Sequence, residues 1–121
     1  MPHKIHKIAI ITDDIEAAVQ FYTQKLGLTL VERFPNEDDE DYVFLDAGGI
    51  TLELMPQKTM GQEPGFHHIS FEVDSVEDSA QELKDKGVKI TKEAFDVGSG
   101  ITLGFFEGPN QMNLQLFHRD Q

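Results

Sequence analysis

The sequence predicts an α+β fold made of two tandem βαβββ modules, and the main reason is an internal repeat. The signals for a strand, a helix and three strands occur once before a proline-bounded connector and once after it. The two copies also match residue by residue, 61 positions apart, at His6 and His67, Ile8 and Ile69, Asp13 and Asp74, Glu16 and Glu77, Gln20 and Gln81, and Lys25 and Lys86. Two copies are too few for a solenoid, so we expect a pseudo-symmetric pair that makes one domain.

The repeat and the chain length predict the domain organisation. A chain of 121 residues is long enough for one domain with its own core. Within this single domain, residues 1–56 form the first βαβββ module and residues 66–121 form the second. Residues 57–65 lack periodicity, lie between Pro56 and the second module, and are expected to be a connector.

In the first module the strand and helix signals alternate clearly. We expect a helix that begins after Asp13 and ends at Gly27, with strands over residues 5–12, 29–34, 42–47 and 50–55. Asp13 and Glu16 have the spacing of a capping box, and glycine is common just after a helix. The pair Gly48-Gly49 between the last two strands is typical of a hairpin turn.

The second module repeats this order. We expect a helix from Asp74 to Lys86, which Gly87 ends, and strands over residues 66–73, 88–90, 101–106 and 112–117. For the strand that begins at Val88, an extension to Phe95 remains open. Turns are expected at Gly98-Ser99-Gly100 and at Gly108-Pro109-Asn110.

Composition and charge exclude several classes of partner. The formal net charge of −12 argues against binding to nucleic acid or to an anionic membrane, and favours cationic over strongly anionic ligands. The same net charge is also explained without any ligand, because it keeps a protein soluble. Cysteine is absent, so disulfides are excluded and a cytoplasmic location is expected. No apolar run reaches the length of a membrane span, and no signal segment is present at the start.

The alternation within the strands predicts which side chains share a face. Each helix must cover the apolar face of its own module, which places His6, Ile8 and Ile10 beneath the first helix and His67, Ile69 and Phe71 beneath the second. The opposite faces then carry Lys7, Glu53, His68 and Gln115. If the modules pair about a pseudo-twofold axis, we expect these four side chains to converge.

The chain resembles the vicinal oxygen chelate superfamily, also called the glyoxalase/bleomycin-resistance/dioxygenase fold. The resemblance covers the whole length and is carried by HKIAIITDDIEAAVQFY with LGL, ITLELMP, FHHISFEVD with GV, and FFEGPNQMNLQL. It implies that the two modules form a half-open β-barrel with a cleft. It implies less about function, because one fold of this kind supports several chemistries.

In metal-using members of that superfamily, the ligands come from the four positions above. The resemblance implies Glu53, His68 and Gln115 as ligands of a divalent metal, zinc or nickel. Lys7 stands where these members usually have a histidine ligand, and a protonated ammonium cannot ligate a metal. Gln115 stands where they usually have glutamate. These replacements argue against extradiol dioxygenase and fosfomycin-modifying activity.

Two functions follow from the resemblance. The first is a glyoxalase I-like lyase or isomerase, with Glu53 as the catalytic base, that acts on a small carbonyl compound or a thiol hemithioacetal through an enediolate. The second is a metal-free binding protein of the bleomycin-resistance type. In that case Lys7 pairs with Glu53 in an acidic cleft for a cationic ligand, and Phe44, Phe106 and Phe117 are either stacking surface or core. Both functions predict a small-molecule partner and a homodimer.

Overall fold

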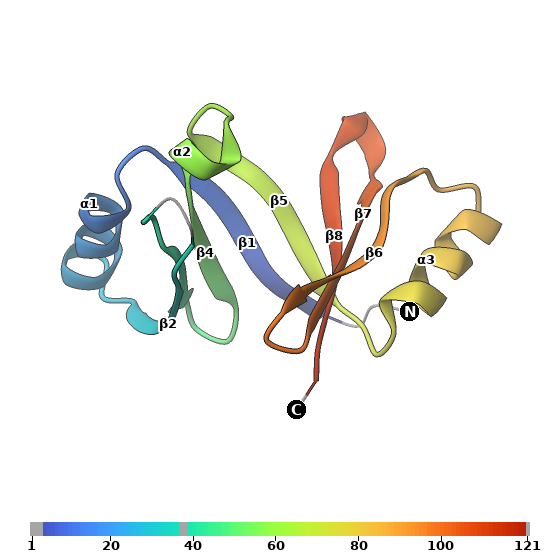
Figure 1. Cartoon of the computed structure of the whole chain (residues 1–121), viewed down its shortest axis with the longest axis horizontal. Helices are drawn as coiled ribbons and strands as arrows, with labels where there is room; N and C mark the ends of the chain where they lie inside the picture. Colours follow the sequence, from blue (N-terminus) through green and yellow to red (C-terminus); the bar gives the residue numbers. More distant parts are fainter. Residues whose placement is uncertain (1–3, 37–38, 121) are drawn as a thin grey trace. The chain divides into compact units, whose positions relative to one another are not determined.

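The structure is a computed structural model that describes residues 4–36 and 39–120 (Figure 1). It confirms the expected α+β fold with two βαβββ modules. The first module consists of β1 (Lys4–Thr12), α1 (Ile15–Gln20), β2 (Thr29–Phe34), β3 (Tyr42–Asp46) and β4 (Thr51–Pro56). The second consists of β5 (Gly65–Glu72), α3 (Val76–Asp85), β6 (Ile90–Gly98), β7 (Ile101–Glu107) and β8 (Asn113–Arg119). No helix among the described residues is long and apolar enough to cross a membrane.

Three elements differ from the sequence prediction. The connector contains a short helix, α2 (Gln57–Met60), and the turn expected near Pro109 is a 3-10 helix, η2 (Pro109–Gln111), before β8. After α1 the chain continues as a π-helical turn, η1 (Phe21–Lys25), so the predicted first helix has two parts. For the strand predicted to begin at Val88, the extension to Phe95 is correct, because β6 runs from Ile90 past Phe95 to Gly98.

Both helices begin one residue later than the capping pattern predicts. The side chain of Asp14, not Asp13, accepts a hydrogen bond from the Ala17 N–H at 3.0 Å. In the second module, Ser75 replaces Asp74 as the cap, and its Oγ accepts from the N–H of Asp78 at 3.1 Å. The cap is the residue whose extended backbone directs its oxygen at the first free N–H groups, and neighbouring polar residues compete for that position.

Each module forms four hydrogen-bonded strands in the same arrangement. The strand orders are β2-β3-β4-β1 and β5-β8-β7-β6. β1 runs parallel to β4, and β5 runs parallel to β8, whereas the other pairs within each module are antiparallel. The matched pairs Ala9 with Glu53 and Ser70 with Gln115 show that the repeat extends to the register.

The chain divides into two compact units at matched positions of the repeat. One unit holds residues 7–67, and the other holds the described residues up to His6 together with those from His68 onward. The predicted place of His6 beneath the helix of its own module is wrong, because His6 stacks on Phe117 of the unit that contains α3, with ring centroids 4.0 Å apart. The place of His67 beneath the second helix stays a prediction. Alternation along a strand shows the face of a side chain but not where the strand changes its packing partners.

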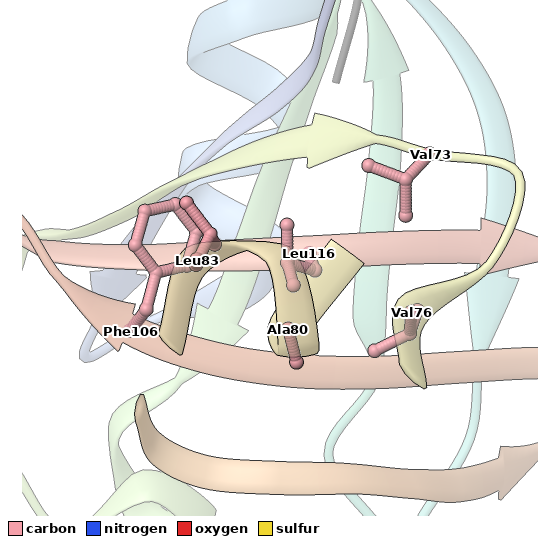
Figure 2. Close-up of a cluster of buried hydrophobic side chains, with 6 residues drawn as sticks. All are labelled: Val73, Val76, Ala80, Leu83, Phe106 and Leu116. Atoms are coloured by element: carbon pink, nitrogen blue, oxygen red, sulfur yellow. The ribbon is translucent and has the colours of Figure 1, made fainter. Parts of the chain in front are cut away.

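Each unit has its own apolar core under its helix. Figure 2 shows the core of the second unit, where side chains from α3 meet side chains from the neighbouring strands: Val73, Val76, Ala80, Leu83, Phe106 and Leu116. The core of the first unit contains Ile15, Val43, Leu45 and Leu54. Two roles were open for Phe106, stacking surface or core, and the structure places it in the core.

The packing predicts a clear difference between two leucines of the first unit. Leu54 is fully buried, so Leu54→Ala is expected to lower the free energy of unfolding by about 2–5 kcal/mol, because it removes apolar contacts and leaves a cavity. Leu26 is 59% exposed, and Leu26→Ala is the matched control, with an expected loss below about 1 kcal/mol. Urea denaturation of both variants measures the difference. Equal losses would contradict the assignment of Leu54 to the core.

Candidate active site

Lys7 and Glu53 lie on one face of the first unit, opposite the face that α1 covers. Ala9 on β1 is the Cα partner of Glu53 on β4, and Lys7 lies two residues before Ala9, so all three side chains point to the same side. Their neighbours Leu52 and Leu54 point to the other side and pack into the core under α1. Lys7 is only 2% exposed and Glu53 only 8% exposed.

Burial shifts the pKa of both groups toward neutrality. Loss of water lowers the pKa of Lys7 to about 8, although the negative charge of Glu53 opposes the shift. The same loss of water raises the pKa of Glu53 to about 7, and the charge of Lys7 opposes that shift. The two groups are thus electrostatic partners.

The surroundings of this pair are aromatic and aliphatic. Phe44 on β3 is the Cα partner of Glu53, and Lys7 Nζ lies 5.8 Å from the centroid of the Phe44 ring. Farther along the same face, Ala9, Ile11 and Met55 form an apolar cluster. Such surroundings strengthen electrostatic interactions, because little water is present to screen the charges.

Residues from the connector extend this apolar cluster. Met60 of α2 packs against it, and the Tyr42 hydroxyl donates a hydrogen bond to Met60 Sδ at 3.2 Å. A second contact links the connector to the turn after β2, where the Asn36 side-chain amide donates to Thr59 Oγ1 at 3.0 Å. The helix that the sequence did not predict thus helps to cover the face that carries Lys7 and Glu53.

The second unit has a corresponding polar group. His68 on β5 and Gln115 on β8 are each 2% exposed, and Ser70, the Cα partner of Gln115, is fully buried. Phe105 on β7 is also a Cα partner of Gln115, and its ring meets the His68 ring edge to face, with centroids 5.5 Å apart. By register, Phe105 in this unit corresponds to Phe44 in the first.

Phe105 is the site residue that the sequence reasoning missed. The signal was present, because Phe105 follows Phe44 by 61 positions, the same offset as between His6 and His67. Phe106, one of the three phenylalanines expected to be either stacking surface or core, lies on the opposite side of β7, in the core. Of the four predicted site residues, the structure brings Lys7 together with Glu53 in one unit and His68 together with Gln115 in the other.

The donors in either unit do not fit a divalent metal. Zinc and related ions are held by three or more imidazole, carboxylate or thiolate ligands. Among residues 4–36 and 39–120, no three His, Asp or Glu side chains form a group that could hold such an ion. Glu53 has an ammonium as its charge partner, which repels a cation, and Gln115 is a neutral donor. The ligand set of Glu53, His68 and Gln115 therefore stays a prediction from the resemblance.

Comparison with known proteins gives one family. Residues 4–116 match the sequence profile of the Glyoxalase/Bleomycin resistance protein/Dioxygenase superfamily. The uncharacterized protein YwkD of Bacillus subtilis (strain 168) is 32% identical over 124 residues, which cover 95% of this chain and 96% of that protein. A lactoylglutathione lyase of Escherichia coli O157:H7 is 27% identical over 112 residues, or 85% of this chain and 83% of that protein.

A solved structure shows the same fold. The methylmalonyl-CoA epimerase of Mycobacterium tuberculosis superposes with a TM-score of 0.82, covering 99% of this chain and 90% of that one. Its sequence identity is 18%, so the likeness concerns the fold.

Proposed function

The chain belongs to the Glyoxalase/Bleomycin resistance protein/Dioxygenase superfamily, and on this premise we propose that it is a lyase or isomerase of small carbonyl compounds. In the proposed reaction a proton is removed from the carbon next to a carbonyl group and is then returned. The relatives named above include a lactoylglutathione lyase, and the shared fold includes a methylmalonyl-CoA epimerase. Inversion of a carbon that lies between two carbonyl groups, as in methylmalonyl-CoA, requires such a proton transfer.

The observation that carries the proposal is the buried carboxyl group of Glu53. An efficient general base has a pKa near the working pH, and burial raises the pKa of Glu53 to about 7. A carboxyl group perturbed by desolvation and by a specific charge partner is typical of a catalytic position. The apolar cluster of Ala9, Ile11 and Met55 on the same face keeps water away from the reaction.

Glu53 performs both proton transfers in this reaction. The carboxylate accepts the proton as the C–H bond breaks, and the electron pair of that bond forms a carbon–carbon double bond while the carbonyl oxygen becomes negative. The protonated Glu53 then returns the proton. Return to the neighbouring carbon of an enediolate gives an isomer. Return to the same carbon gives an epimer when the planar intermediate first turns its other face toward Glu53.

Deuterium exchange tests this proposal. The probes are the hemithioacetal of methylglyoxal with glutathione and, separately, methylmalonyl-CoA, and ¹H NMR in D₂O follows loss of the proton next to the carbonyl group. We expect the protein to catalyse exchange in at least one probe, and Glu53→Gln to lower the rate by about 100-fold or more. The matched control is Glu16→Gln, a carboxylate 70% exposed on α1 and paired with Arg33, which should keep the wild-type rate.

Two results would contradict the proposal. One is exchange of neither probe above the rate in buffer, and the other is full activity of a folded Glu53→Gln protein. Circular dichroism of each variant shows whether it is folded. If Glu53→Gln does not fold, the pH profile of the wild-type protein, which requires no variant, replaces it as the test.

A metal-free binding function is the second candidate. The observation that favours it is the electrostatic pairing of Lys7 with Glu53, which this function predicts without any chemistry. Its probe is bleomycin, a cationic ligand suited to a chain with a net charge of −12. Tight binding of bleomycin by calorimetry, together with no deuterium exchange in either carbonyl probe, would favour this candidate over the enzyme.

A further inference from the structure

We propose that the ammonium group of Lys7 is the electrophile that holds the oxyanion formed when Glu53 removes the substrate proton. The inference rests on the proposed function. It assigns to a side chain the role that a metal ion has in the metal-using members of the superfamily. Lys7 would thus be a catalytic residue, and the reaction would proceed without a bound metal.

The path of the Lys7 side chain places its charge beside Glu53. Lys7 lies on β1, Glu53 on β4 and Phe44 on β3, and β4 lies between the other two strands. Neighbouring strands are about 4.8 Å apart, so β1 and β3 are separated by about twice that distance. Because Lys7 Nζ approaches the Phe44 ring centroid to 5.8 Å, the lysine side chain extends across the face of β4, where Glu53 lies.

Burial makes this ammonium an effective electrophile. Lys7 is 2% exposed, and besides its charge partner Glu53 the same face carries the apolar side chains of Ala9, Ile11 and Met55. A positive charge that is fixed in dry surroundings stabilises a developing oxyanion far more than the same charge does in water. An ammonium has three N–H groups, so it can donate to Glu53 and to a substrate oxygen at the same time.

The charges balance through the whole reaction. Before proton transfer, Glu53 is negative and the ammonium of Lys7 is its partner. When the C–H bond breaks, the proton neutralises Glu53 and the negative charge moves to the substrate oxygen. The ammonium keeps its proton throughout and changes its main partner from Glu53 to the oxyanion. A base and a fixed cation on the same face of the sheet are the two groups that such a reaction needs.

Lys7→Met tests this inference through the deuterium-exchange assay. The substitution keeps a side chain of similar length and removes the charge. We expect the maximum of the pH–rate profile to fall by about 100-fold or more relative to the maximum of the wild-type profile, with a smaller change in KM; comparing the two maxima allows for any change in the Glu53 pKa. The matched control is Lys84→Met, a lysine on α3 that pairs with Glu93 at 2.7 Å, and it should keep the wild-type rate.

Chemical rescue separates catalysis from a structural role. In Lys7→Ala, added methylammonium chloride is expected to restore part of the exchange rate, whereas tetramethylammonium, which has no N–H group, is not. A folded Lys7→Met protein whose maximal rate equals that of the wild-type protein would overturn the inference. Loss of wild-type activity on dialysis against EDTA, with recovery on addition of zinc or nickel, would also overturn it and leave the proposed function intact. If the wild-type protein does not catalyse exchange, the proposed function itself is wrong.

Discussion

Replacing Glu53 by alanine is expected to lower the free energy of unfolding by about 3–5 kcal/mol at pH 7.5. Burial lowers the pKa of Lys7, and the negative charge of Glu53 counteracts this effect. Both side chains are buried. Without Glu53, the protein must either keep an uncompensated ammonium in apolar surroundings or remove its proton, and both cost free energy. Urea denaturation followed by circular dichroism measures the loss.

The double variant Lys7→Met/Glu53→Leu separates the effect of charge from that of packing. It replaces the buried pair by apolar side chains of similar size, and such replacements are often neutral or stabilising by about 1–4 kcal/mol. We therefore expect the double variant to be at least as stable as the wild-type protein. The control is Glu16→Ala, which removes an exposed partner of Arg33 and should cost less than about 1 kcal/mol. If Glu53→Ala were as stable as this control, burial of the Lys7 ammonium would not depend on the charge of Glu53.

The second large effect is a narrow, bell-shaped dependence of kcat/KM on pH, with the maximum between pH 7 and pH 8. Glu53 must be ionised to accept a proton, and its pKa is raised to about 7, so the rate should fall about tenfold for each pH unit below 7. Lys7 must be protonated to hold the oxyanion, and its pKa is lowered to about 8, so the rate should fall in the same way above pH 8. Because the two groups interact, the apparent pKa values of both limbs are properties of the Lys7–Glu53 pair and not of either residue alone.

Substitution of Lys7 by arginine provides the control for this profile. A guanidinium remains protonated over the measured range, so Lys7→Arg is expected to lose the alkaline limb and to keep the acidic one. Exchange rates from pH 5 to pH 10, measured in buffers of constant ionic strength, show both limbs. An alkaline limb near pH 8 that persists in an active Lys7→Arg variant would mean that another group titrates there.

The fold and the identity of the polar faces were predictable from the sequence. Side chains alternate strictly along a strand, so the residues that follow Lys7 and those that flank Glu53 define which face carries each group. The repeat confirms this assignment independently, since Ala9 and Ser70 take equivalent places in the two registers. Local signals were less accurate at the helix starts, where Asp14 and Ser75 cap in place of Asp13 and Asp74.

Sequence by itself thus determined the two modules, their strands and the side chains that lie opposite the helices. Only the tertiary structure decided that Lys7 and Glu53 are buried together, that His6 stacks on Phe117, and that Phe105 rather than Phe106 meets the polar face. The physical reason is that alternation and helical period are properties of a single segment. Burial, and with it the pKa of a charged group, depends instead on residues from strands far apart in the chain.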